Sequence, residues 1–234
     1  MVQKPTEQEL WYAAGTESLR YLSGASIAVF GAGRTVCQAL QAFHDRHMHD
    51  TMLVVCGSMG TELFAKRLGG ITIQDVPALD GLSYVYIDGA DQIDPARNLI
   101  KGGFKGTGNP GLEGCMAREK RIALGANTFV VIADPSKEVP YLGFGNYGLP
   151  VEFKQSYEGQ VKAFLRNAGL TSSQIRKNPD GTLFVTENGN HILDVSFNGA
   201  EHDLVNLETI LDTDLIFSNG LFAIRKPDHV IIAK

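Results

Sequence analysis

Two acidic residues and a lysine stand close together in the chain, in a setting that suits sugar chemistry. Asp88 and Asp91 follow the apolar run 84–87, and Lys101 precedes Gly102 and Gly103. Carboxylates and an ammonium group can polarise the hydroxyls and the carbonyl of a sugar, and glycines let the backbone approach it closely. Calcium binding and simple turn capping are the alternatives, although an Asp-x-x-Asp pattern lacks the ligand density of a calcium loop.

Glycine-rich and hydroxyl-bearing segments point to an anion site. The run Gly-Ala-Gly-Arg-Thr at 31–35 follows one apolar run, and the segment 58–61, from Ser58 to Thr61, follows another. Each opens a predicted helix, where backbone amides and the helix dipole can hold a phosphate. A tight turn and a helix N-cap are the alternative interpretations. Val36 replaces the third glycine of a dinucleotide fingerprint and no acidic residue closes the second strand, so NAD is not expected.

Cysteines and histidines give no sign of a metal or disulfide framework. The three cysteines are widely spaced without a CxxC pairing, which indicates free thiols in a reducing cytosol: Cys37, Cys56 and Cys115. The histidines at 44, 47 and 49 look like a metal tract, but a solvated helix end is the favoured interpretation. We therefore predict no metal.

Parallel strands must position these residues. Short apolar, β-branched runs predict buried strands at 26–30, 52–56, 71–73, 84–87 and 129–133. Apolar residues at helical spacing predict helices at 6–21, 35–48 and 61–68. Alternation of strands and helices implies right-handed crossovers and a parallel sheet, in which ligands bind beyond the carboxyl ends of the strands.

The pattern changes after residue 150. A helix is predicted at 157–168, and the Asn188-Gly189 pair between two apolar runs in 183–195 predicts a β-hairpin. This part is interpreted as a small α+β unit. The final stretch 221–233 contains strand-like pieces that could return to the first sheet.

Charge and hydropathy exclude several classes of partner. The 234 residues carry a formal charge of -5, which leaves no basic field for nucleic acid, although a few local donors could still bind a small anion. No apolar run approaches the roughly 18 residues that span a bilayer, and the N-terminus lacks a signal peptide's apolar core. A cytoplasmic protein without nucleic-acid or membrane partners is predicted.

An ordered series of motifs resembles the ribose-5-phosphate isomerase A family. From about Tyr84 to the C-terminus the chain reads, in order, YIDGADQI, LIKGG, AREK, FVVIADPSK, LPVEF, NGNHILDV and GLFAIR. The resemblance implies an α/β fold, with a Rossmann-like parallel sheet domain at 1–147 plus 222–234 and a smaller ferredoxin-like α+β domain at 148–221. It also implies a homo-oligomer, either a dimer or a tetramer.

The same resemblance implies an activity and its residues. The family interconverts ribose 5-phosphate and ribulose 5-phosphate through an enediol, in the pentose phosphate pathway and without a cofactor. Glu119 maps onto the family's base; alone, the segment 117–120 would be an ordinary charged helix face. Lys101 would stabilise the enediolate, and Asp88 and Asp91 would orient sugar hydroxyls. The remaining substrate and phosphate residues implied are Gly31, Gly33, Arg34, Thr35, Ser58, Thr61, Gly102, Gly103 and Lys137.

Departures from the family pattern keep other functions open. The usual GTGST turn has become GAGRT, so that Ala32 and Arg34 replace hydroxyl residues. Gln92 and Ala117 replace the family's residues in two further motifs. An insertion occupies 104–114 beside the reacting centre. A non-catalytic sugar-phosphate-binding paralogue and an isomerase of another sugar phosphate are the alternatives. A CoA-transferase relative, with glutamate as nucleophile, is a further rival.

Overall fold

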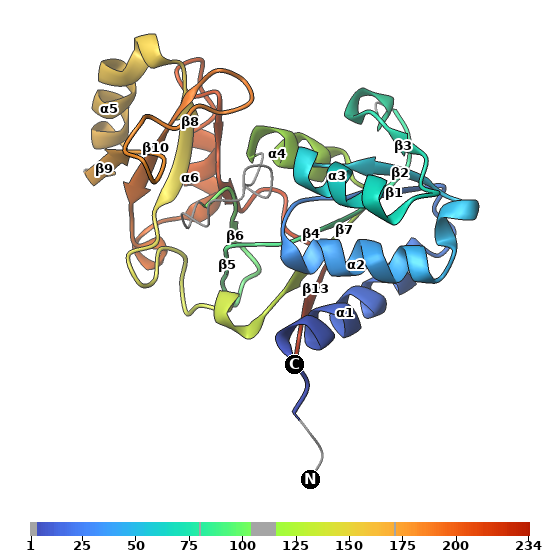
Figure 1. Cartoon of the computed structure of the whole chain (residues 1–234). Coiled ribbons are helices and arrows are strands. Elements are labelled where there is room, and N and C mark those ends of the chain that lie inside the picture. Colours follow the sequence, from blue (N-terminus) through green and yellow to red (C-terminus); the bar gives the residue numbers. More distant parts are fainter. Residues whose placement is uncertain (1–3, 80, 104–115, 171) are drawn as a thin grey trace.

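A six-stranded parallel sheet forms the centre of the molecule. The computed structural model describes residues 4–79, 81–103, 116–170 and 172–234. The strand order is β3-β2-β1-β4-β7-β13, and every neighbouring pair is parallel (Figure 1). The strands are β1 (Ile27–Phe30), β2 (Leu53–Cys56), β3 (Ile73–Gln74), β4 (Val85–Asp88), β7 (Thr128–Ala133) and β13 (His229–Ile232).

Helices cover both faces of this sheet because its strands are apolar on both sides. Ala28 and Phe30 of β1 pack among α1 (Glu7–Ser18), α2 (Arg34–Asp45) and α3 (Met59–Leu68). Ile27 and Val29, which point to the other face, pack against α4 (Met116–Gly125). Short 3-10 turns lie at Leu19–Leu22, Met48–Asp50, Val76–Leu79, Pro135–Lys137, Gln155–Tyr157 and Gly199–Glu201.

A second, smaller unit lies beside the parallel sheet (Figure 1). Its antiparallel sheet has the order β11-β8-β10-β9 and packs with two helices around a separate core. Its elements are β8 (Leu149–Phe153), α5 (Glu158–Asn167), β9 (Ser172–Ile175), β10 (His191–Ser196), α6 (Leu204–Ile210) and β11 (Ser218–Asn219). Between the two units runs a short sheet of β5 (Gln92–Ile93), β6 (Leu99–Ile100) and β12 (Leu221–Phe222).

The predicted fold class is confirmed, with one local error. The parallel sheet and the smaller α+β unit are both present, and β13 returns to pair with β7. The predicted hairpin around Asn188-Gly189 is wrong: the turn forms, but β10 pairs with β8 and β9 instead of with the run before the turn. None of the helices in the described ranges is long and apolar enough to cross a lipid bilayer.

Candidate active site

Asp88 ends β4 at the carboxyl edge of the sheet and is completely buried. Its Oδ1 accepts the backbone N–H of Ala32 at 2.9 Å and that of Gly89 at 2.7 Å, and its Oδ2 accepts the hydroxyl of Tyr86. Gly31 lies so close that an added Cβ would be 2.0 Å from Oδ1. Only glycine fits at position 31, and Asp88 thereby joins β4 to the turn after β1.

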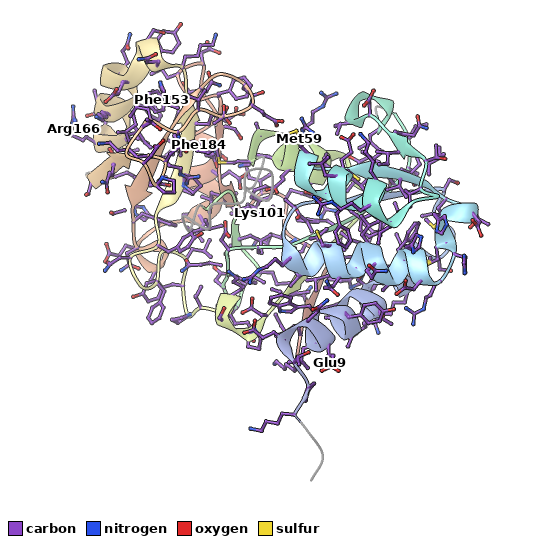
Figure 2. The ribbon with its side chains drawn as sticks, in the orientation of Figure 1. Glu9, Met59, Lys101, Phe153, Arg166 and Phe184 are labelled. Carbon is purple, nitrogen blue, oxygen red and sulfur yellow. The ribbon has the colours of Figure 1, made fainter. Side chains whose placement is uncertain are left out.

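Lys101 follows β6 and places its ammonium group between two carboxylates. Its Nζ lies 2.6 Å from Asp88 Oδ2 and 3.4 Å from Glu119 Oε2, and donates to the carbonyl of Gly89 at 2.7 Å. Burial by itself lowers the pKa of Lys101, but the charges of Asp88 and Glu119 outweigh burial and raise it. Lys101 therefore stays cationic at neutral pH. In Figure 2 it lies where the two units meet.

Glu119 lies in the first turn of α4, on the face directed toward Lys101. Its side chain is buried, and Oε2 has no hydrogen-bond partner among the described residues. Burial raises the pKa of Glu119 to about 8, with Lys101 opposing the increase and Asp88 and Asp91 adding to it. A buried carboxylate with a raised pKa and an oxygen that has no hydrogen-bond partner is suited to accept a proton.

Asp91 lies near the same centre but makes different contacts. Its Oδ2 accepts the N–H of Gly103 at 2.6 Å, and its charge together with burial raises the pKa of Tyr147. Burial also raises the pKa of Asp91, while Gly103, Lys101 and Lys137 oppose the increase. Asp91, Gly103 and Lys137 are thus grouped together.

The glycine turn after β1 has fewer available donors than the sequence suggested. The N–H of Gly31 donates to the carbonyl of Ile87 at 2.9 Å, and that of Ala32 is used by Asp88. The predicted phosphate contact from the Gly31 amide is therefore corrected to a structural bond. Gly33, with a φ of 108°, is the N-cap of α2, and Thr35 lies in the first turn of that helix. These first-turn amides have no intrahelical acceptor and are open to an anion.

Ser58 and Thr61 connect the second strand end to the first. The Ser58 hydroxyl accepts the N–H of Thr61 at 3.1 Å and so caps α3. The Thr61 hydroxyl donates to the carbonyl of Gly31 at 2.6 Å. Both side chains are buried. In this arrangement the two hydroxyls serve the protein's own turns, in line with the N-cap alternative, and would have to rotate to reach a phosphate.

Arg34 begins α2 but turns toward α1. Its guanidinium lies over the indole ring of Trp11, 4.8 Å from the ring centroid, and the side chain is exposed. Gly102 has a φ of 82°, and a Cβ there would lie 3.0 Å from Met116 Cβ, at the start of α4. The insertion at 104–114 and Cys115 lie outside the described residues.

Several residues at the site were missed by sequence reasoning. Tyr86 lies two residues before Asp88 on one strand face, so the period of two could have found it. Tyr147 and Arg176 carried no local signal because they come from distant segments. Lys120 was noticed only as part of its motif; its Nζ donates to Glu208, Asn219 and the Leu221 carbonyl.

No metal centre is found in the described part of the chain, where His, Cys, Asp and Glu form no group of three with metal-binding geometry. The rings of His44 and His49 stack 4.9 Å apart. The prediction of a solvated helix end is wrong for His49, whose side chain is 9% exposed. Cys37 and Cys56 are buried, which raises the pKa of Cys37 to about 11 and that of Cys56 to about 12.

The fold and the site define a class of protein. A parallel α/β sheet carries, at its carboxyl edge, a buried carboxylate beside a fixed ammonium group, a pair of groups that is suited to proton-transfer chemistry. The chain belongs to the family described as ribose 5-phosphate isomerase A (phosphoriboisomerase A), whose model matches residues 53–234.

Individual relatives agree with this assignment over most of the chain. Ribose-5-phosphate isomerase A of Synechococcus sp. (strain RCC307) is 35% identical over 209 residues, covering 87% of this chain and 82% of the relative. The structure of ribose 5-phosphate isomerase A from Methanocaldococcus jannaschii superposes with a TM-score of 0.80 at 26% identity, covering 98% of this chain and 96% of that one. A D-ribose-5-phosphate isomerase in complex with phospho-erythronic acid gives a TM-score of 0.81 at 25% identity, with the same coverage.

Proposed function

We propose that this enzyme interconverts D-ribose 5-phosphate and D-ribulose 5-phosphate. The observation that carries the proposal is the buried trio in which Lys101 Nζ lies 2.6 Å from Asp88 and 3.4 Å from Glu119. Such a trio provides both a base and a cation within one water-poor site. Isomerisation requires these two groups and no electron carrier.

Glu119 acts as the proton shuttle in this mechanism. Its carboxylate takes the proton from C2 of the open-chain aldose, and the C–H electrons form the C1–C2 double bond while the C1 carbonyl oxygen becomes negative. Lys101 stabilises that oxygen, and proton exchange between O1 and O2 shifts the charge to O2. The carbonyl then forms at C2, and Glu119 returns its proton to C1. Because burial favours neutral Glu119, proton acceptance is easier than for an exposed carboxylate.

The two aspartates take separate parts. Asp88 already accepts from two backbone amides, the Tyr86 hydroxyl and Lys101, so its oxygens are fully engaged. Its part is therefore to hold Lys101 and the glycine turn, in place of the sugar contact expected from the sequence. Asp91 remains the carboxylate proposed to orient sugar hydroxyls.

The phosphate is assigned to the first turn of α2. The amides beyond Gly33 and the exposed Arg34 supply donors there, and Lys137 supplies a further cation near Asp91. The Thr35 hydroxyl donates to the Ile132 carbonyl at 3.5 Å and would turn from it to join them. The structure of a relative is a complex with phospho-erythronic acid. This compound combines a phosphate with a planar carboxylate that resembles an enediolate. We expect it to compete with ribose 5-phosphate here.

Further properties of the family are proposed on the same basis. The enzyme needs no metal or organic cofactor, forms a homo-oligomer (dimer or tetramer), is cytoplasmic, and belongs to the pentose phosphate pathway. The domain boundaries at 147/148 and 221/222 are likewise proposed, and β8 at Leu149–Phe153 and β11 at Ser218–Asn219, both in the sheet of the smaller unit, lie inside them.

The direct test is incubation of the purified protein with ribose 5-phosphate, followed by measurement of ribulose 5-phosphate. Glu119→Gln keeps the side-chain shape but cannot accept a proton, and we expect it to lower kcat by about a hundredfold or more with KM nearly unchanged. Glu62→Gln, on the exposed surface of α3, is the matched control. Binding of ribose 5-phosphate without turnover by the wild type would instead identify a sugar-phosphate-binding paralogue.

A further inference from the structure

One peptide group beside the site is held on both of its edges. The carbonyl of Gly102 accepts from Arg176 Nη1 at 2.8 Å, and the N–H of Gly103, which belongs to the same peptide plane, donates to Asp91 Oδ2 at 2.6 Å. Gly102 has a φ of 82°, a conformation that favours glycine, and glycine has more backbone freedom than any other residue, so bonds to its peptide restrict a segment that would otherwise be mobile in φ and ψ. We call this peptide with Arg176 and Asp91 the peptide clamp.

Arg176 reaches the clamp from the smaller unit. It follows β9 directly, and its side chain is 6% exposed. Nε donates to Asp194 Oδ2 at 3.0 Å and Nη2 to Asp194 Oδ1, so the guanidinium is oriented by a bidentate pair while its third nitrogen faces Gly102. A planar fork with three fixed bonds is specific to arginine.

The clamped peptide adjoins the parts of the site that do chemistry. Lys101 immediately precedes it, and Met116 at the start of α4 lies against Gly102. On the other side the Tyr147 hydroxyl covers Gly103 so closely that a Cβ there would lie 1.5 Å from it. Rotation of this peptide would therefore disturb Lys101, Asp91 and the helix that carries Glu119.

We propose that Arg176, held by Asp194, is a positioning residue for the isomerisation, and that it acts by fixing the Gly102–Gly103 peptide. The inference rests on the proposed function, since its consequence is expressed in turnover. It also assigns a part in catalysis to the smaller unit, which already holds the neighbours of Glu119 through the side chains of Glu187, Glu208 and Asn219. A small displacement of Lys101 relative to Glu119 is enough to slow the reaction strongly.

The test compares three variants with the wild type. Arg176→Met keeps an unbranched stem up to the position of Nε but removes the guanidinium and all three bonds. Arg176→Lys keeps the charge and can make part of the contacts, and Asp194→Asn weakens the anchor. Arg166→Met, on the exposed face of α5, is the matched control for loss of an arginine. For each protein kcat, KM, their pH profiles, the thermal midpoint and the amide exchange rate of Gly103 are measured.

We expect Arg176→Met to lower kcat by about tenfold to a hundredfold with KM within about threefold, to alter the pH profile of kcat, and to speed exchange of the Gly103 amide. Arg176→Lys should recover part of kcat, and Arg166→Met should match the wild type. A purely structural Arg176 would lower the thermal midpoint while leaving kcat and its pH profile intact, which would overturn the proposal.

Two outcomes separate this inference from the proposed function. If the wild type does not isomerise ribose 5-phosphate, the proposed function fails, and Gly103 exchange alone decides whether the clamp exists. Unchanged Gly103 exchange in a folded Arg176→Met would overturn the clamp whatever the activity. If Arg176→Met does not fold, Arg176→Lys and Asp194→Asn decide: wild-type kcat in both would overturn the proposal, and intermediate losses would support it.

Discussion

At the scale of single residues, Glu119 owes its basicity to what surrounds it. A carboxylate taken out of water loses hydration that only hydrogen bonds or a cation can replace. Here Lys101 is 3.4 Å away, and Oε2 has no hydrogen-bond partner among the described residues. Lys101 replaces only part of the lost hydration. The neutral acid is therefore favoured, and the ionised form is a stronger base than an exposed glutamate.

This setting predicts the pH dependence of activity. Glu119 must be ionised to take the C2 proton, and burial raises its pKa to about 8. We expect kcat/KM to rise with pH and to level off above about 8, while the phosphate of the substrate, with a pKa near 6, accounts only for changes at lower pH. In Lys101→Met the residual activity should reach its plateau at higher pH, because the cation that lowers the pKa of Glu119 is lost. A profile without change between about pH 6 and 9 would contradict the assignment of Glu119.

The same shift predicts a pH-dependent cost to stability. The folded-state pKa of about 8 lies above the ordinary 4.5, so the folded protein binds more protons than the unfolded chain between these values. The contribution of Glu119 to the free energy of unfolding is therefore largest below about pH 4.5, and it is lost as the pH rises toward 8. Glu119→Gln has no such proton. We expect urea unfolding to show that the free energy of unfolding of Glu119→Gln rises relative to that of the wild type by roughly 4 kcal/mol between about pH 5 and 8.5. A constant difference would contradict the shift.

At the scale of elements, α1 and α2 act together at the predicted phosphate site. Arg34 begins α2, and Trp11 of α1 supports its guanidinium from 4.8 Å. We propose that this stacking holds the cation near the N-terminus of α2, where the phosphate is assigned. Arg34→Ser should therefore raise KM for ribose 5-phosphate by an amount equivalent to about 1 to 3 kcal/mol, with a smaller effect on kcat.

A second variant tests whether the Trp11 ring orients Arg34. Trp11→Leu keeps an apolar contact with α2 but removes the aromatic face, so Arg34 keeps its charge and loses its orientation; we expect a smaller rise in KM than in Arg34→Ser. Steady-state kinetics and inhibition by inorganic phosphate measure both effects. Unchanged KM and unchanged phosphate inhibition in Arg34→Ser would leave the anion to the helix amides and Thr35 alone.

Elements were more predictable than the contacts between them. Apolar β-branched runs located the main strands, and the rule that ligands bind at strand ends located Asp88 and the glycine turn. The hairpin at Asn188-Gly189 failed because that local signal fixes the turn but not the strand partner, which β9 supplies. Tyr147 and Arg176 could not be predicted, since neither belongs to a motif and only tertiary packing brings them to Gly102 and Gly103.

At the scale of the whole molecule, the two units share the reacting centre. Lys101 donates its backbone N–H to Gly220, and β6 pairs with β12, so the chain segment leaving the smaller unit holds the lysine's strand. Lys120 binds Glu208, Asn219 and the Leu221 carbonyl, which ties α4 to the same segment. The position of Glu119 relative to Lys101 therefore depends on how the smaller unit docks.

This arrangement also bears on metal dependence. Lys101 lies between the carboxylates of Asp88 and Glu119 and supplies the positive charge that the enediolate requires. The histidines that look like a metal tract lie at the other end of α2: Arg34 begins that helix and His44 is close to its end, about 15 Å along the axis. An ion bound by those histidines would be too far away to polarise a sugar carbonyl.

We therefore expect activity to be independent of metal. Dialysis against a chelator should leave kcat and KM of the wild type unchanged, and added divalent cations should not raise them. Lys101→Met should lose most of its turnover and should not be restored by Mg²⁺ or Zn²⁺, because Asp88 accepts from Tyr86 and from two amides and has little capacity left for an ion. Elemental analysis of the purified protein accompanies the kinetics. Stoichiometric metal whose removal abolishes activity, and whose return restores it, would show that Lys101 is not the electrophile assigned to it.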